Sequence, residues 1–191
     1  KINSENLQIA ENICLILPIH KILDEIIEKS RGDENIGTTK KGIGPAYEDK
    51  IGRRSIRLCD LSDQEILRKK ISNICLFHQP RLKSSNINID EEALLEDLVK
   101  VYKEIYQYSA PIWKKINELG NQNKTILFEG AQGSLLDIDF GTYPYVTSSN
   151  TSSGQIFAGT GFGIKNNHQV FGITKAYTTR VGAGPFPAEL K

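Results

Sequence analysis

The sequence predicts an α/β protein in which residues 1–120 are mainly helical and residues 121–191 contribute strands and loops. Two observations support this division. Apolar residues recur at helical spacing through most of the first part. The character of the sequence changes at Lys124, after which short apolar runs typical of β-strands occur. With 191 residues, 39% of them hydrophobic, the chain can bury a sizeable core as one domain or as part of a larger one.

The first predicted helix covers residues 5–31, although Pro18 should break or kink it. His20 is a lone histidine in this segment, so we expect a structural role rather than metal binding. A short helix is expected over residues 46–50, directly after Pro45.

Three longer helical segments follow. Ser62 begins a capping-box pattern, and Pro80 is expected to end the helix that it starts. Asp90 suits the N-cap of the next helix, because its carboxylate can accept from the first free N–H groups. Pro111 suits the first turn of a further helix, which Gly120 should stop.

The stretch over residues 37–54, which includes the short helix expected after Pro45, concentrates the positive charge of the chain. From Gly37 to Arg57 the net charge is +4, whereas the whole chain carries +1. Glycines that allow close approach, hydroxyls and cations together suit a phosphate group, and a solvated basic loop is the alternative. The residues concerned are Gly37, Gly42 and Gly44, the hydroxyls Thr38 and Thr39, and the cations Lys40, Lys41, Lys50, Arg53, Arg54 and Arg57.

The second part begins with a predicted strand over residues 125–128, which runs directly into a Gly-x-x-Gly segment containing Gln132. Open α/β sheets bind ligands where a strand passes into a loop, and an amide side chain can both donate and accept hydrogen bonds. A plain tight turn is the alternative. Residues 147–154 are rich in hydroxyls and could be a flexible linker, although aromatic residues flank them. A second strand is expected over residues 169–176.

Composition excludes several classes of protein. The near-neutral charge argues against nucleic-acid or membrane-surface binding. No apolar run is long enough to span a membrane, and no signal peptide begins the sequence. The three cysteines (Cys14, Cys59 and Cys75) lack C-x-x-C spacing, which favours reduced, buried thiols in a cytoplasmic protein. The sequence begins at Lys1 and contains no methionine, so we expect an internal fragment.

Four segments, in this order, resemble the adenylosuccinate synthetase family. The first fits the signature G-I-G-P-x-Y-x-x-K-x-x-R, and the other three fit further family motifs. They are residues 42–53 (GIGPAYEDKIGR), 128–133 (FEGAQG), 141–151 (GTYPYVTSSNT) and 179–187 (TRVGAGPFP). The helical residues 62–120 are the least distinctive part.

The resemblance implies a cytoplasmic, homodimeric ligase of purine biosynthesis that depends on GTP and Mg²⁺ and joins IMP to L-aspartate. GTP would phosphorylate the 6-oxygen of IMP, and the aspartate amine would then displace phosphate to give adenylosuccinate. The parent fold would hold a large central, mostly parallel sheet like that of P-loop NTPases. Residues 1–191 would be the central part of that domain, with a largely helical subdomain.

The resemblance also implies roles for five residues. Thr39 and Thr147 would bind the 5′-phosphate of IMP, and Arg53 would reach the IMP phosphate held by the partner protomer. Gln132 would contact the hypoxanthine near the oxygen that is phosphorylated. Lys50, the signature lysine, would act electrostatically. Each role agrees with the chemistry of the side chain.

The sequence departs from the family pattern at Lys40 and Lys41, where many relatives have a small residue followed by arginine. The catalytic aspartate and histidine and the Mg²⁺ ligands are expected before Lys1, and the aspartate loop and the guanine-binding motif after Lys191. The 191 residues alone are therefore expected to be inactive, with no metal site of their own. Two alternatives remain open: a non-catalytic nucleotide-binding or dimerisation module, and an RNA- or DNA-binding module that uses the basic loop.

Overall fold

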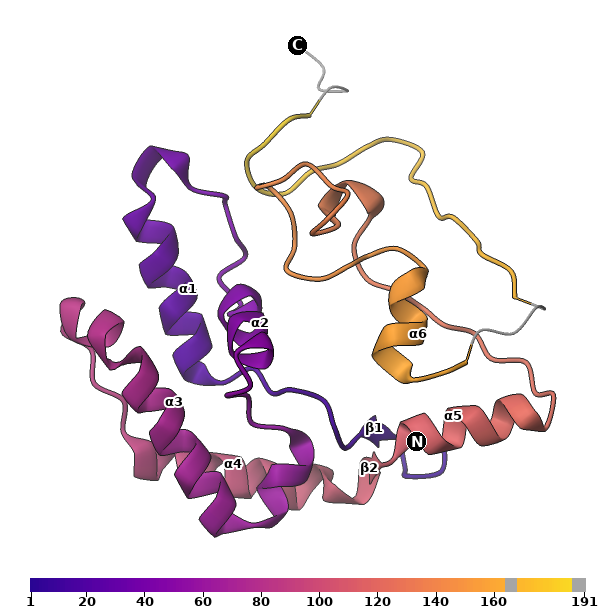
Figure 1. Cartoon of the computed structure of the whole chain (residues 1–191), viewed down its shortest axis with the longest axis horizontal. Helices are drawn as coiled ribbons and strands as arrows, with labels where there is room; N and C mark the ends of the chain where they lie inside the picture. The colour runs from indigo at the N-terminus through magenta and orange to yellow at the C-terminus, as the bar shows by residue number, and fades with distance from the viewer. Residues whose placement is uncertain (164–167, 187–191) are drawn as a thin grey trace. The chain divides into compact units, whose positions relative to one another are not determined.

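The computed structural model describes residues 1–163 and 168–186 and divides into two compact units (Figure 1). The first unit comprises Lys1–Ile27 and Lys40–Lys115, and the second comprises Glu28–Thr39 and Ile116–Lys191. The predicted α/β class is confirmed, because helices dominate and two short strands pair in parallel.

Six α-helices and four 3-10 turns lie within the described residues. The helices are α1 (Pro18–Ser30), α2 (Ile43–Ile51), α3 (Gln64–Ser84), α4 (Glu91–Ile105), α5 (Ile112–Asn121) and α6 (Gly154–Thr160). The 3-10 turns are η1 (Gly32–Glu34), η2 (Leu58–Ser62), η3 (Tyr106–Tyr108) and η4 (Ser134–Leu136). None of the helices in this described part combines the length and apolarity needed to cross a membrane.

The parallel strands lie in the first unit, not where the sequence predicted them. Strand β1 (Ile9–Ala10) pairs with β2 (Ser109–Ala110), with Ile9 opposite Ser109. The predictions of strands over 125–128 and 169–176 are wrong for the described chain, which forms no ladder there. A strand needs a hydrogen-bonded neighbour as well as apolar residues, and Leu127 and Ile173 are instead 86% and 97% exposed.

One proline begins a helix and another lies within a helix. Pro18 begins α1 instead of kinking a longer helix over 5–31, because its fixed φ and missing N–H suit the first helical position. Pro80 was expected to end a helix, but α3 continues to Ser84. Leu82, in the turn after Pro80, is 4% exposed within the core. Burial of such side chains offsets the backbone hydrogen bond that proline removes.

Hydrogen bonds between residues close in sequence cap the helices α3 and α4. The cap of α3 is Asp63 rather than Ser62, since the Asp63 carboxylate accepts from the backbone N–H groups of Glu65 and Ile66. The prediction for α4 is confirmed, because Asp90 accepts from the N–H of Ala93.

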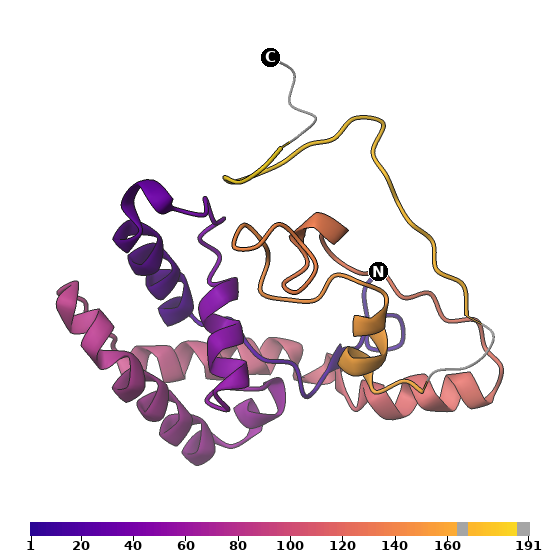
Figure 2. The same cartoon turned by 45° about the horizontal axis from the view of Figure 1, so that its top comes forward.

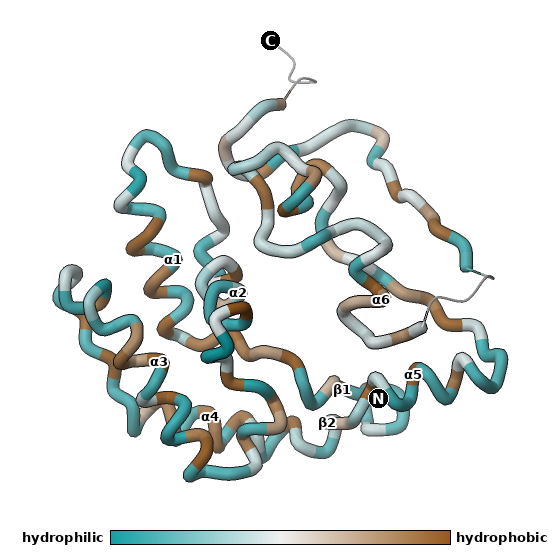
Figure 3. Tube along the Cα trace, in the orientation of Figure 1, coloured by the Kyte–Doolittle hydropathy of each residue, from teal (hydrophilic) through white to brown (hydrophobic). Residues whose placement is uncertain are grey.

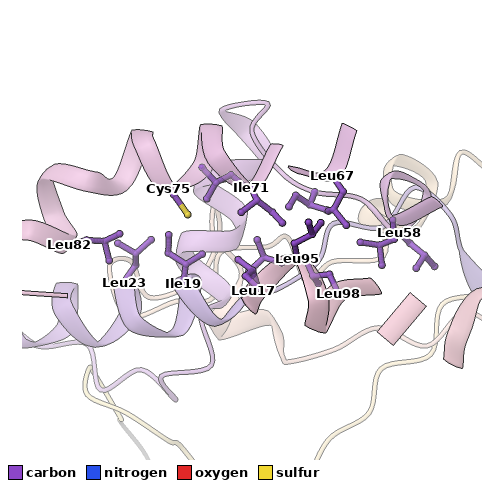
Figure 4. Close-up of a cluster of buried hydrophobic side chains, with 14 residues drawn as sticks. Leu17, Ile19, Leu23, Leu58, Leu67, Ile71, Cys75, Leu82, Leu95 and Leu98 are labelled. Atoms are coloured by element: carbon purple, nitrogen blue, oxygen red, sulfur yellow. The ribbon is translucent and has the colours of Figure 1, made fainter. Parts of the chain in front are cut away.

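The hydrophobic core lies in the first unit, among α1, η2, α3 and α4. Figure 4 shows side chains of α1, including Ile19 and Leu23, pointing toward those of α3, including Ile71 and Cys75. Bands of apolar and polar residues recur along these helices (Figure 3). Apolar residues spaced three to four positions apart lie on one face of a helix, and that face is buried.

All three cysteines are free thiols. Cys75 is buried as expected, and burial together with nearby Glu91 raises the pKa of its thiol to about 11. The expectation of burial is wrong for Cys59, which is exposed, and Cys14 is half-buried.

In the described residues after α5, the second unit has little regular structure apart from α6 and the turn η4. Residues 168–186, drawn in yellow in Figures 1 and 2, form neither helix nor strand. Side-chain hydrogen bonds therefore define the local conformation of this unit more than backbone ladders do.

Candidate functional site

The loop that carries Thr147 folds around one carboxylate in the second unit. Asp137, which is 1% exposed, accepts hydrogen bonds from the backbone N–H groups of Asp139 and Phe140 at 2.9 and 3.1 Å. It also accepts from the N–H of Thr151 at 2.6 Å. Thr147 is half-buried, and its N–H donates to the carbonyl of Leu136 at 2.8 Å. A buried acid thus fixes a loop that has no helix or strand.

Gln132 projects from a turn attached to that loop. Its φ of +61° lies in the left-handed region, and its side chain is exposed. The carbonyl of the next residue, Gly133, accepts from the Thr151 hydroxyl at 3.1 Å. The backbone next to Gln132 is therefore bonded to the segment that follows Thr147, and the Gln132 side chain is exposed.

The segment that precedes Thr39 is bound on two sides. The N–H of Gly37 donates to Glu28 Oε1 at 2.7 Å, and the carbonyl of Ile36 accepts from the N–H of Ala183 at 3.0 Å. Gly37 has φ of +71°, and a Cβ there would lie 2.8 Å from the Cα of Gly182. Only glycine fits this approach without strain. Thr39 itself is exposed.

Arg180 links these segments. Its Nε donates to the carbonyl of Ala183 at 2.9 Å, and its Nη2 to the carbonyl of Tyr145 at 3.0 Å. Its Nη1 donates to the Thr142 hydroxyl at 3.3 Å. The planar guanidinium suits this multiple donation. Together with the bonds above, Arg180 joins the segments that carry Thr39, Gln132 and Thr147 into one hydrogen-bonded network.

Lys50 and Arg53 belong to the first unit, on α2 and directly after it. Both side chains are exposed. Lys50 Nζ lies 5.3 Å from the centre of the Tyr47 ring, within the range of a cation–π contact. Arg53 has φ of +60°, an uncommon conformation for a residue other than glycine.

A buried carboxylate also fixes α2. Asp49 is fully buried and lies 3.1 Å from His20 Nε2, 3.0 Å from His78 Nε2 and 2.8 Å from Arg54 Nε. Burial by itself raises the pKa of Asp49, but the hydrogen bonds from these three side chains outweigh it and hold the pKa below its ordinary value. The carboxylate therefore stays ionised inside the unit.

The hydrogen bonds of His20 define which ring nitrogen carries a proton. The N–H of Leu17 donates to His20 Nδ1 at 3.0 Å, so Nε2 carries the proton that faces Asp49. The structural role expected for His20 is confirmed. No group of three or more potential metal-ligating side chains is arranged to hold an ion within residues 1–163 and 168–186.

Sequence reasoning missed the roles of Arg180, Asp137 and Asp49. Arg180 lies in a quoted motif but was given no role. Asp137 stands among Leu135, Leu136 and Ile138, and an acid within an apolar run is a signal that could have identified a buried, hydrogen-bonded carboxylate.

Comparison with known proteins adds a second line of evidence. A family model, adenylosuccinate synthetase, matches residues 1–191. The chain belongs to the adenylosuccinate synthetase family. The fold is also similar to a solved structure described as a fully ligated adenylosuccinate synthetase from Plasmodium falciparum, with 36% sequence identity and a TM-score of 0.86. That match covers 96% of this chain and 43% of the Plasmodium chain, so the present chain spans less than half the length of this synthetase.

Proposed function

We propose that this chain is the IMP-binding part of a cytoplasmic enzyme that joins IMP and L-aspartate to form adenylosuccinate, an activity of AMP biosynthesis. Residues 1–191 would be the central part of one synthetase domain. The family membership supports this proposal. The observation that carries it is the network through Arg180, which connects the segments bearing Thr39, Gln132 and Thr147.

In this proposal, two hydroxyls bind the 5′-phosphate of IMP. Thr39 and Thr147 offer short donors, and phosphate oxygens accept strongly from such groups. Thr147 is the better positioned of the two, because its backbone is bonded to Leu136. The free hydroxyl of exposed Thr39 is then available to the ligand from a segment anchored at Gly37.

The reaction requires activation of the 6-oxygen of IMP, which is a poor leaving group. This oxygen takes the γ-phosphoryl group of GTP, leaving GDP, and the aspartate amine then attacks C6 as the C–O bond breaks and phosphate departs. Gln132 donates its amide N–H to the oxygen as negative charge develops on it. The task of the chain is thus positioning and charge stabilisation.

Two cations of the first unit also have proposed roles. Arg53 extends to the IMP phosphate bound by the partner protomer, which makes the enzyme a homodimer with shared sites. Lys50, the signature lysine, acts electrostatically, and its Nζ lies 5.3 Å from the centre of the Tyr47 ring. Both side chains are exposed, as reaching a ligand or a partner requires.

Mg²⁺, when bound, neutralises charge on the transferring phosphoryl group. We propose that its ligands and the GTP site belong to residues outside this sequence. The chain alone is then inactive, and catalysis needs a longer polypeptide that carries it.

The test is a turnover assay with IMP, GTP, Mg²⁺ and L-aspartate. The longer polypeptide should form adenylosuccinate, whereas the 191-residue chain alone should form none. Failure of the longer polypeptide to do so would reject the ligase function. IMP binding without turnover in both forms would favour a non-catalytic nucleotide-binding or dimerisation module. Binding to RNA or DNA that weakens steeply with salt would favour the nucleic-acid alternative.

A further inference from the structure

The feature that carries a further inference is the buried carboxylate of Asp137 in the second unit. Five N–H donors converge on it: the backbone N–H groups of Asp139, Phe140, Thr151 and Ser152 and the side-chain amide of Asn150. The donors come from two arms of one loop, 139–140 and 150–152. The carboxylate therefore closes a loop of more than ten residues at its base.

No regular structure replaces these bonds if they are lost. The loop between η4 and α6 has neither helix nor strand. Apart from Asp137, its two arms are joined by the Ile138 N–H, which donates to the Ser149 carbonyl at 3.2 Å, and by the Asn150 amide, which donates to Asp139 at 2.6 Å. Hydrogen bonds to an ionised acceptor are about twice as strong as neutral ones. These hydrogen bonds, of which the one from the Thr151 N–H has the largest effect, lower the pKa of Asp137 to about 2. The carboxylate is therefore charged at neutral pH.

The same carboxylate is connected to the segments that carry two of the three predicted ligand-binding residues of this unit, Thr147 and Gln132. Thr147 lies on the loop that Asp137 closes. Thr151, which donates its N–H to Asp137, donates its hydroxyl to the carbonyl of Gly133, next to Gln132. One buried carboxylate thus connects, through Thr151, the loop that carries Thr147 to the turn that carries Gln132.

We propose that Asp137 is a positioning residue of the nucleotide site, which sets the spacing between Thr147 and Gln132 without touching the ligand. The ligand is IMP, and this part of the proposal rests on the proposed function. A purely structural role would predict general destabilisation. A positioning role predicts a local loss of order and weaker binding while the first unit remains intact.

The matched pair of variants is Asp137→Asn and Asp139→Asn. Both remove one carboxylate charge from the same loop, but Asp139 is exposed and accepts only from Asn150 in the described contacts, at 2.6 Å. Asparagine can keep that bond. At position 137 it places an N–H₂ group against backbone donors, which leaves buried N–H groups unsatisfied.

Two measurements on the 191-residue chain test the proposal. Hydrogen–deuterium exchange should show faster exchange over residues 138–152 in Asp137→Asn only, with α3 and α4 unchanged in both variants. Calorimetric titration with IMP should show affinity lower by about tenfold or more for Asp137→Asn and within about twofold of the wild type for Asp139→Asn.

The outcomes separate this inference from the proposed function. Unchanged exchange over 138–152 in Asp137→Asn, or wild-type IMP affinity in that variant, would overturn the positioning role. If the wild-type chain fails to bind IMP while exchange behaves as expected, the ligand assignment fails and Asp137 remains the organiser of the loop. Faster exchange throughout both units would reduce Asp137 to a general structural role and contradict the proposal.

Discussion

His78 Nε2 lies 3.0 Å from Asp49 Oδ2, and neither side chain is more than 1% exposed. His20 reaches the same oxygen from α1 at 3.1 Å, so a single carboxylate on α2 binds α1 and α3 together. Arg54 also donates to Asp49, and its guanidinium lies 3.6 Å from the centre of the Phe77 ring. The helices α1, α2 and α3 and the segment that follows α2 therefore depend on one buried charge.

Replacing Asp49 should destabilise the first unit strongly. Asp49→Ala leaves two buried histidines and Arg54 without their acceptor, and breaking such a network costs on the order of 3 kcal/mol of unfolding free energy. Urea unfolding followed by circular dichroism measures the loss. The control is Asp97→Asn, whose surface pair with Lys100 should contribute less than about 1 kcal/mol. Equal effects for the two variants would contradict the assigned role of the network.

The pH dependence of the stability should show the contribution of the Asp49 carboxylate. Because the folded pKa of Asp49 lies below its unfolded value, its contribution is present above about pH 4 and is lost as the pH falls below that value. Unfolding midpoints of the wild type should therefore fall with acidification from about pH 4. Asp49→Asn should have a flatter profile in this range, and an identical slope would count against the explanation.

Much of the helical part was predictable because its signals are local. Asp90 was correctly identified as a cap, since its partner is three residues away. The cap of α3 was placed one residue early, because Ser62 and Asp63 both suit the position and only the backbone geometry selects between them. Pro80 was misjudged because burial of Leu82 outweighs a local preference.

The remaining features depend on distant partners and could not be predicted in the same way. His20 and His78 are each 29 residues from Asp49 in sequence, so nothing local indicates the network. The predicted strands failed for the same reason, because pairing is decided by a neighbour. The site residues Thr39, Lys50, Arg53, Gln132 and Thr147 came from motifs, and their ligand contacts remain predictions.

Gly42 should not tolerate a side chain. Its φ is +79°, and a Cβ would lie 2.8 Å from the backbone of His20 and Lys21. Gly42→Ala should therefore reduce the unfolding free energy by more than about 1 kcal/mol. Gly163→Ala is the control, since no atom of the described residues lies within 4 Å of its Cβ position and its φ is not in the left-handed range. Thermal melts that shift equally would show that the close approach at Gly42 is unimportant.

Arg53→Ala should separate binding from folding. The side chain is exposed, so its removal should change the unfolding free energy by no more than about 0.5 kcal/mol. If Arg53 reaches the IMP of a partner, the variant should bind IMP about tenfold or more weakly wherever the wild type is dimeric. Sedimentation and calorimetry on the same samples check both points. Unaltered affinity in a dimeric sample would remove Arg53 from the site.

The most direct test of the central claim is calorimetric titration of the 191-residue chain with IMP, alongside Gln132→Ala and Thr147→Val. If the segments joined through Arg180 form the IMP site, the wild type binds saturably and each variant loses about tenfold or more in affinity, with unchanged unfolding midpoints. Saturable binding that neither substitution weakens would contradict the account.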